Sequence, residues 1–263
     1  MTNRLSIIQI CPCFVDLGKE TGGVANVVRQ ICLQLANQHM QVLLLCGNRE
    51  LGKIKAPPGR TRINDFLTIE VFEQGSHPLL GPTKGLIARI KELERPCVAH
   101  VHTCFSAFTE DAMSTLHSQN IPFIFTPHGK LTHHFLKQSY WPKKIWWFFK
   151  GKTAIKNTSM IGAISTEEAH QLATLGLNRP MQIVPNGYEL PPDISTTDTP
   201  RLIPDPYILF LGYLDPRKQP QFLLEVYAKS KSRETHQLVF VGPDSYSLQG
   251  TLQRKAKELG VEN

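Results

Sequence analysis

The sequence predicts an α/β protein in which a Rossmann-like parallel sheet forms the first domain and an incomplete second domain of the same type follows. Two observations lead to this class. Short apolar runs alternate with amphipathic, helix-forming stretches along nearly the whole chain, and one proline-rich stretch interrupts the alternation before it starts again. With 263 residues, 41% of them apolar, the chain can build one large or two smaller hydrophobic cores, so we do not expect a disordered protein.

The first strand, helix and strand form the clearest part of the pattern. LSIIQI at 5–10 is an apolar run, ETGGVANVVRQICLQLANQ at 20–38 repeats apolar residues three and four positions apart, and VLLLC at 42–46 is apolar again. This order predicts a parallel βαβ crossover whose helix has one buried face. Gly22 and Gly23 lie where the helix starts and where N–H groups lack partners. Bare backbone there either makes a tight turn or lets an anion approach closely.

The same alternation continues through the rest of the first domain. Strands are expected near 68–72 and at 97–102, 122–126, 159–164 and 181–184, and helices near 83–94, at 106–118, around 142–157 and from 166. Apolar strands interleaved with amphipathic helices indicate a parallel sheet that is covered on both faces. Ser165 and Glu168 form a capping box, which fixes the start of the helix at 166 and is structural.

A proline-rich stretch separates the two parts of the pattern. LPPDISTTDTPRLIPDP at 190–206 carries five prolines, a composition that resists helices and sheet ladders and is typical of a connection between domains. We therefore predict a first domain at 1–190, a linker at 191–206 and a second domain at 207–263. In the second domain a strand, a helix, a strand and a helix are expected at 207–212, 219–230, 237–242 and 248–259. Two βα units are few for an independent domain, so we expect it to be incomplete, with an exposed parallel edge.

The charge limits the partners without choosing one. A formal net charge of +7 favours anions such as nucleotides, phospholipid surfaces or nucleic acid. The aliphatic run near the N-terminus is too short to span a membrane, and it lacks the basic start and the cleavage site of a signal peptide, so we expect a cytoplasmic protein. Nucleic-acid binding would rest on charge alone, and we do not predict it.

The spacing of cysteines and histidines gives little support for a metal site. The six cysteines form no CxxC pair, and several fall in expected strands or on the apolar helix face, so we expect small hydrophobic side chains rather than disulfides. CPC at 11–13 is a lone CxC pair. His100 and His102 alternate along one strand, and three further histidines lie between 128 and 134, but no carboxylate or cysteine accompanies them at ligand spacing. We therefore expect no metal.

Seven segments together resemble one enzyme family. In chain order they are GGVANVV, HVHTCFS, FTPHGKL, AISTEEAHQL, IVPNGYELP, FLGYLDPRKQP and FVGPD. Their order and spacing resemble those of the retaining, nucleotide-sugar-dependent glycosyltransferases of the group 1 (family 4) type, which have the GT-B fold. The resemblance spans nearly the whole chain. It implies two Rossmann-like domains facing a cleft, a nucleotide-sugar held mainly by the second domain, and a glycan or lipid-linked acceptor held mainly by the first.

The resemblance also implies roles for single residues of the first domain. The N–H groups of Gly22 and Gly23 would bind the donor diphosphate or the transferred sugar. His128 in TPHG would be the catalytic residue, contacting the sugar near the reacting bond to orient and polarise it rather than act as a general base. The alternative is a histidine that only hydrogen-bonds its loop. His102, at the end of the preceding strand, either lines the cleft or packs. No metal or cofactor is implied, because the nucleotide-sugar is the substrate.

The second domain and the connection to it carry the remaining candidates. Arg217 and Lys218 in LDPRKQ would neutralise the diphosphate as it departs, unless they form only a solvated charged turn. Gly212 would line the same cleft. Asn186 and Gly187 in VPNGY match a family loop near the interdomain hinge and would line the cleft, although NG is also a common tight-turn pair.

Departures from the family's pattern leave the activity open. Tyr213 stands where arginine is common, and Gln219 stands where glycine is usual. The glutamates that bind the ribose and the sugar in the family would lie past residue 263. The chain therefore fits a transferase, one part of a split enzyme that needs a complementing C-terminal chain, or a non-catalytic remnant that binds a partner. A dinucleotide oxidoreductase and a P-loop phosphotransferase are not supported, because neither GxGxxG nor GxxxxGK followed by Ser or Thr occurs.

An aromatic and basic segment has two interpretations. YWPKKIWWFFKGK at 140–152 mixes Trp and Phe with lysines, and many enzymes of the resembling family use lipid-linked acceptors. The segment would then give a peripheral contact with the inner face of the membrane. Burial of its Trp, Phe and Ile side chains in a basic helix on the first domain would explain the same residues.

Overall fold

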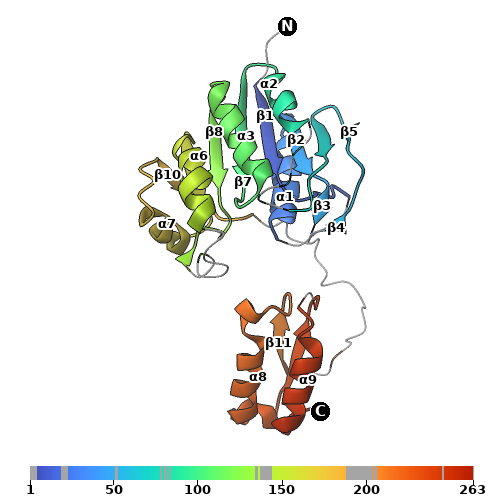
Figure 1. The fold of residues 1–263 in the computed structure, drawn as a ribbon. Coiled ribbons are helices and arrows are strands. Elements are labelled where there is room, and N and C mark those ends of the chain that lie inside the picture. The colour runs from blue at the N-terminus through green and yellow to red at the C-terminus, as the bar shows by residue number, and fades with distance from the viewer. Residues whose placement is uncertain are drawn as a thin grey trace. The chain divides into compact units, whose positions relative to one another are not determined.

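The chain divides into two compact units, Met1–Leu190 and Pro191–Asn263, each built from strands and helices (Figure 1). In this computed structural model the described residues are 5–18, 23–50, 53–77, 79, 81, 83, 85–133, 136, 144–187, 203, 206–244 and 246–262. The proline-rich stretch expected to connect two domains lies almost wholly outside them. None of the helices in these ranges has the length and apolar character needed to span a bilayer.

The first unit is built on an eight-stranded sheet with the strand order β10-β9-β8-β7-β1-β2-β6-β5. The strands are β1 (Ser6–Cys11), β2 (Gln41–Gly47), β5 (Gly59–Arg62), β6 (Leu67–Phe72), β7 (Cys97–His102), β8 (Phe123–Thr126), β9 (Met160–Ala163) and β10 (Met181–Ile183). Neighbouring strands are parallel except for β5 and β6. Helical crossovers between parallel strands confirm the predicted Rossmann-like arrangement.

Adjacent residues of β2 point into two different cores, one on each face of the sheet. Leu44 clusters with Val28 and Cys32 of α1 (Gly23–Asn37), whereas Leu45 clusters with Phe108 of α3 (Ala107–Ser118). Three shorter helices add to the second core: α2 (Leu86–Lys91), α6 (Lys152–Lys156) and α7 (Thr166–Ala173). Full burial of one such side chain is worth about 1.5–3 kcal/mol. The sheet is thus covered on both faces, as the apolar strands predicted.

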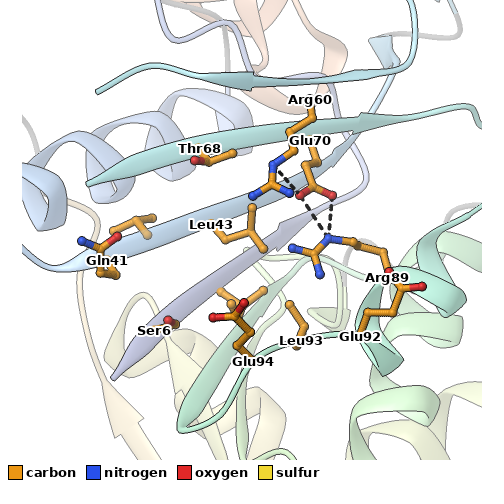
Figure 2. Close-up of a pocket in the computed structure, with 12 residues that line it drawn as sticks. Ser6, Gln41, Leu43, Arg60, Thr68, Glu70, Arg89, Glu92, Leu93 and Glu94 are labelled. Carbon is orange, nitrogen blue, oxygen red and sulfur yellow. Dashed lines mark hydrogen bonds and ion pairs between the residues drawn. The ribbon is translucent and has the colours of Figure 1, made fainter. Parts of the chain in front are cut away.

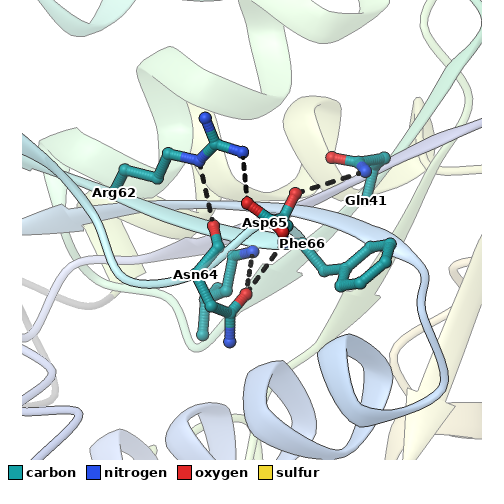
Figure 3. A network of polar contacts seen from close by, with 6 residues as sticks. Gln41, Arg62, Asn64, Asp65 and Phe66 are labelled. Carbon is teal, nitrogen blue, oxygen red and sulfur yellow. Dashed lines mark hydrogen bonds and ion pairs between the residues drawn. The ribbon is translucent and has the colours of Figure 1, made fainter.

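The edge strand β5 was not predicted. Its sequence GRTR has four exposed side chains, so it shows neither an apolar run nor an alternation. A polar turn connects it to β6 (Figure 3). In this turn Asn64 Oδ1 accepts hydrogen bonds of 2.8 Å from the N–H groups of Phe66 and Leu67. Arg62 forms a 2.8 Å ion pair with Asp65. At this edge the sheet is antiparallel rather than parallel. A short hairpin of β3 (Arg49–Glu50) and β4 (Lys53–Ile54) was also missed.

Helix α2 is shorter than the sequence predicted. It covers six residues rather than 83–94, because Gly85 precedes it with a φ of 81° and Glu92 follows it outside the helical region. A left-handed residue cannot continue a right-handed helix toward the N-terminus.

The helix expected around 142–157 contains a π-helical turn. Trp147–Gly151 forms this turn and leads directly into α6. A Cβ atom on Gly151 would overlap the ring of Trp146, which is buried. Glycine therefore allows the Trp146 ring to pack against this backbone, and the wide turn accommodates it.

The second unit has a two-stranded parallel sheet of β11 (Tyr207–Leu211) and β12 (Gln237–Val241). With α8 (Pro220–Lys229) and α9 (Gln249–Glu258) it forms two βα repeats, close to the predicted ranges. Its buried core consists of Leu214, Leu224 and Leu252. Alternate residues of β11 face the other way: Tyr207, Leu209 and Leu211 are 41%, 48% and 71% exposed. One face of this sheet is therefore apolar and exposed.

Candidate active site

The carboxyl ends of the central strands in the first unit surround a pocket of about 250 Å³. Cys13 follows β1, Arg49 follows β2, Thr103 follows β7 and Lys130 follows β8, and all four residues line the pocket. Open α/β sheets bind their ligands at this end, where the loops leaving the strands converge. The pocket therefore marks the ligand-binding end of the sheet.

A larger hollow of about 460 Å³ lies toward the amino ends of β1 and β2 (Figure 2). Arg89 Nε donates to both carboxylate oxygens of Glu70, at 2.9 and 3.0 Å, and Arg60 Nε lies 3.3 Å from the same carboxylate. The buried charge of Glu70 is thus neutralised within the protein. Because the hollow also lies at the wrong end of the strands for ligand binding, we interpret it as structural.

His102 and His128 meet at the ends of β7 and β8. His102 is the fully buried last residue of β7, and His128 lies two residues after β8. Nδ1 of His102 is 2.9 Å from Nε2 of His128, and Nε2 of His102 is 2.7 Å from Oε1 of Gln9 in β1. The two histidine rings are stacked, with centroids 5.2 Å apart. His102 is therefore packed behind His128 and not exposed to solvent.

Burial keeps this histidine cluster neutral. Desolvation lowers the pKa of His128 to about 4, and desolvation with the nearby His128 lowers the pKa of His100 to about 4. Burial, followed by the neighbouring His100 and His128, also lowers the pKa of His102 well below its usual value. At neutral pH each ring therefore has one N–H donor and one lone pair. Such rings match sugar hydroxyls better than phosphate oxygens, which need donors.

A buried glutamate holds the loop that carries His128. The φ angles of 51° at His128 and 77° at Gly129 place two successive residues in the left-handed region. Glu168 accepts hydrogen bonds from the N–H groups of Gly129, at 2.5 Å, and Ile164, at 2.8 Å. Ser165 Oγ accepts from the Glu168 N–H at 3.1 Å, so the serine half of the expected cap is present. The carboxylate instead connects the loop after β8 to the loop after β9.

The turn after β7 is strained where it enters the pocket. Thr103 has a φ of 59°, although β-branched residues disfavour the left-handed region. Its N–H donates to the Thr126 carbonyl at 2.7 Å, which holds the turn against β8. The Thr103 hydroxyl is buried without a hydrogen-bond partner in the described part of the chain. A buried hydroxyl of this kind beside a pocket is a natural contact for a ligand.

The cysteines add no metal site. All six are free thiols, and a hydrogen bond between Cys11 and Cys13 raises the pKa of Cys11 and lowers that of Cys13. Across the ranges that the structure describes, no group of three or more His, Cys, Asp or Glu side chains is placed to hold a metal ion.

Gly22 lies outside the described residues, and Gly23 is the first residue of α1. Gly23 has a φ of 62°, and a Cβ atom on it would find no other atom within 4 Å. The backbone conformation therefore favours glycine, and the space beside it is open. The first turn of α1 itself contains no acidic side chain that would oppose an anion.

Arg217 and Lys218 lie in a 3-10 turn after β11, but their surroundings differ. Arg217 Nε donates to both Asp215 oxygens, at 3.0 and 2.9 Å, and its Nη2 also contacts Asp215. This hydrogen bonding holds the pKa of Asp215 below its usual value. Lys218 forms no ion pair within the described ranges, and a Cβ on Gly212 would lie 2.5 Å from Lys218 Nζ. Gly212, with a φ of 141°, therefore leaves room for the Lys218 ammonium.

One departure from the family pattern and two further sequence candidates lie near element ends. Gln219, where glycine was expected, has a φ of 53° at the start of α8, so this position requires the conformation that glycine adopts most easily. Asn186 and Gly187 follow β10 at the sheet edge and are exposed. β9 separates their strand from the strand that precedes His128.

Comparison with known proteins identifies the family. The sequence model of Glycosyltransferase Family 4 matches residues 21–190, which include Gly23 and both paired histidines. The chain belongs to Glycosyltransferase Family 4. Among curated protein sequences, none matches it significantly.

Solved structures show that this Family 4 chain has the predicted GT-B-like α/β fold. It is similar to a sucrose-phosphate synthase from Thermosynechococcus elongatus, with a TM-score of 0.63 and 16% identity over 97% of this chain and 68% of that chain. Anabaena HepE in complex with UDP gives a TM-score of 0.56 and 16% identity over 98% of this chain and 67% of that chain. An α,α-trehalose 6-phosphate synthase from Burkholderia multivorans gives a TM-score of 0.53 and 12% identity over 100% of this chain and 68% of that chain. At these identities the likeness concerns the fold alone.

Sequence reasoning missed three contacts of this Family 4 site. Gln9 interrupts the apolar run of β1, and a polar residue at the centre of a buried strand was a readable signal for a buried partner. The positive φ of Thr103 could not be predicted, because threonine is β-branched and disfavours this conformation. Glu168 was assigned to a helix cap, and its contact with Gly129 depends on β8 and β9 being neighbours in the sheet.

Proposed function

We propose that this Family 4 protein transfers a sugar from a nucleotide-sugar to a polysaccharide or glycolipid acceptor, with retention at the anomeric carbon. The observation that carries the proposal is the neutral His102–His128 pair at the carboxyl ends of the strands, beside a pocket that Lys130 and Thr103 line. These groups match a substrate rich in hydroxyls. Proteins of similar fold include HepE in complex with UDP and with UDP-glucose, which supports a nucleotide-sugar as the donor class.

The proposed reaction takes place on one face of the sugar. The bond from the anomeric carbon to the phosphate oxygen breaks, and a bond to the acceptor hydroxyl oxygen forms. The acceptor proton moves to the oxygen of the leaving phosphate. His128 orients and polarises the sugar without taking this proton. We expect no metal or further cofactor for this step.

Lys218 is a better candidate for the diphosphate than Arg217, because Asp215 already occupies the Arg217 guanidinium. We expect Lys218→Ala to weaken binding of UDP or GDP by about tenfold, the worth of one charge-assisted hydrogen bond. The exposed Lys229, at the end of α8, supplies the control Lys229→Ala, which should bind nucleotide normally. Titration calorimetry with both nucleotides, together with hydrolysis of sugar nucleotides, tests the proposal. Absence of binding and hydrolysis in the unmodified chain would refute it.

Partner binding without catalysis is a second candidate, favoured by the exposed apolar face of β11. Tyr207, Leu209 and Leu211 share this face, and apolar sheet faces of this kind are commonly covered by another element or chain. In this alternative the second unit associates with a complementing chain that carries the nucleoside pocket. Nucleotide binding by a co-purified complex, but not by this chain alone, would favour it.

We further propose a cytoplasmic protein that contacts the inner face of the membrane. Ile145, Phe148 and Phe149 are 56%, 79% and 74% exposed, whereas Trp146 between them is buried. Lys150 lies in the same segment. Exposed aromatic side chains beside lysines favour the headgroup region of an anionic bilayer, close to a lipid-linked acceptor.

A further inference from the structure

Gln9 determines where the proton of His102 lies. Gln9 occupies the middle of the central strand β1 and is almost completely buried, so its polar group needs a partner. Its carbonyl oxygen Oε1 lies 2.7 Å from Nε2 of His102. A carbonyl oxygen can only accept a hydrogen bond, so Nε2 of His102 must carry the hydrogen. Because the ring is neutral, its Nδ1 is then a lone pair.

The same argument extends to His128. Nε2 of His128 lies 2.9 Å from Nδ1 of His102, and a hydrogen bond there needs one hydrogen. Since His102 Nδ1 can only accept, His128 Nε2 must donate. Nδ1 of His128 is left with a lone pair, and it is buried with no hydrogen-bond partner among the described residues. Leaving such an acceptor unmatched costs about 1–3 kcal/mol, so it calls for an explanation.

We propose that Gln9 and His102 are positioning residues that hold His128 in its Nε2–H tautomer and so present Nδ1 as an acceptor for a substrate hydroxyl. The substrate part of this statement rests on the proposed function, whereas the order of protons does not. A hydroxyl can donate to Nδ1, but an ionised phosphate oxygen cannot. The arrangement therefore assigns His128 to the sugar or the acceptor and not to the diphosphate.

His100 offers a matched comparison, because it is near the chain of hydrogen bonds without belonging to it. The centroid of its ring lies 3.9 Å from that of His102, with the two ring planes tilted by 42°. Its Nε2 is hydrogen-bonded to Thr126 Oγ1 at 2.9 Å. Loss of the Thr126 hydroxyl would remove a buried hydrogen bond next to His102 and leave the contacts of Gln9 intact.

Nitrogen NMR of the imidazole rings tests the proposal directly. The whole chain is labelled with ¹⁵N-histidine and observed at neutral pH, with resonances assigned through His100→Gln and His128→Gln. We expect a protonated Nε2 and an unprotonated Nδ1 for both His102 and His128. A proton on Nδ1 of either ring would overturn the proposal, whatever the catalytic activity. This measurement needs no variant of Gln9 and no substrate.

Two variants then test the positioning role. In Gln9→Met the side chain keeps its length but loses the carbonyl acceptor, so an Nδ1–H signal should appear for His102. His128 Nε2 would then accept from His102, so an Nδ1–H signal should appear for His128 as well. Thr126→Val should leave both tautomers unchanged. An unchanged pattern in Gln9→Met, or the same change in Thr126→Val, would contradict the role of Gln9. If sugar-nucleotide hydrolysis is present, kcat in Gln9→Met should fall about tenfold, the worth of one hydrogen bond. If hydrolysis is absent altogether, the proposed function fails while the tautomer result stands.

Discussion

Individual side chains at the candidate site make the stability of the first unit depend on pH. Burial lowers the pKa of His100 and His128 to about 4 from 6.5, and the pKa of His102 moves in the same direction. Burial raises the pKa of Glu110 to about 7 from 4.5. Between pH 6.5 and pH 4.5 the unfolded chain therefore binds three more protons at the histidines and one fewer at Glu110, a net excess of two.

We predict that the free energy of unfolding of the first unit falls by up to about 2.7 kcal/mol for each unit by which the pH is lowered within this window. The histidine contribution is complete above pH 6.5 and is lost as the pH falls toward the folded pKa. His128→Gln should reduce the slope by about half, because it removes one of the two net protons. All three tryptophans lie within residues 141–147, so their fluorescence in urea reports this unit.

The exposed His117 provides the control for this measurement. His117→Gln changes the same residue type outside the buried cluster and should keep the full slope. Equal slopes for His128→Gln and the unmodified protein would show that His128 already protonates normally in the folded state.

Glu168 should contribute far more to the first unit than its neighbour Glu167. Glu168→Gln leaves one uncharged acceptor oxygen in place of two, so the side chain can no longer accept from both Gly129 and Ile164. We expect a loss of about 1–3 kcal/mol in the free energy of unfolding. Hydrogen exchange of the Gly129 amide should accelerate. Glu167→Gln is the matched change, because Glu167 is exposed and contacts only the Gln171 side chain among the hydrogen bonds described. Similar losses in both variants would argue against the role of Glu168 as the tie between the two loops.

The start of α8 contains a residue in an unfavourable backbone conformation. Gln219 has φ and ψ of 53° and 47°, and it precedes Pro220, the first residue of the helix. The left-handed region costs a residue with a Cβ atom about 1–2 kcal/mol, but glycine adopts it without that cost. We predict that Gln219→Gly raises the stability of the second unit by up to about 1 kcal/mol, after the larger entropy of unfolded glycine is included.

A second glutamine supplies the control for this change. Gln221 lies inside α8, where Gln221→Gly should lower stability by about 1 kcal/mol. The second unit has no tryptophan, so amide hydrogen exchange across α8 is the suitable measurement. Decreased protection in both variants would mean that Gln219 carries no strain.

Elements with a strong apolar period could be predicted, and elements defined by polar or special backbone contacts could not. The helical period of α1 and the apolar runs of β1 and β2 arise because these elements are buried in or against a sheet. Burial requires apolar residues at every third or fourth position of a helix and at every second position of a strand. β5 has four exposed residues, and its position depends on the Asn64 turn. α2 is shortened by the left-handed Gly85, whose conformation the period cannot reveal.

The candidate site was predictable in its place but not in its contacts. The ends of apolar strands located His102 and His128 at the same edge, because parallel strands align their carboxyl ends. Their hydrogen bond depends on β7 lying beside β8. The hydrogen bond to Gln9 depends on β1 lying directly beside β7, which the order along the chain does not state. Arg217 was expected to act with Lys218, but the Asp215 carboxylate two residues away engages its guanidinium.

The molecule as a whole combines a net charge of +7 with an exposed aromatic segment, and these two features together favour an anionic membrane surface. In the proposed membrane contact, the net charge would attract the protein to the surface over about a Debye length, and the aromatic rings would hold it there by leaving water. The π-helical turn leaves Phe148 and Phe149 exposed while Trp146 is buried, so the two phenylalanines can be changed without removing a core residue.

We therefore predict that the whole chain sediments with vesicles containing phosphatidylglycerol and much less with vesicles of phosphatidylcholine alone. Replacing Phe148 and Phe149 by serine should reduce this binding by tenfold or more, since each buried ring contributes on the order of 1 kcal/mol at an interface. Phe222→Ser is the control, because Phe222 is 60% exposed on α8 in the other unit. Raising the salt concentration should weaken binding of all these proteins, but it should not erase the difference between them. Binding that depends on salt and not on the two phenylalanines would mean that the net charge acts alone and that the aromatic segment does not enter the bilayer.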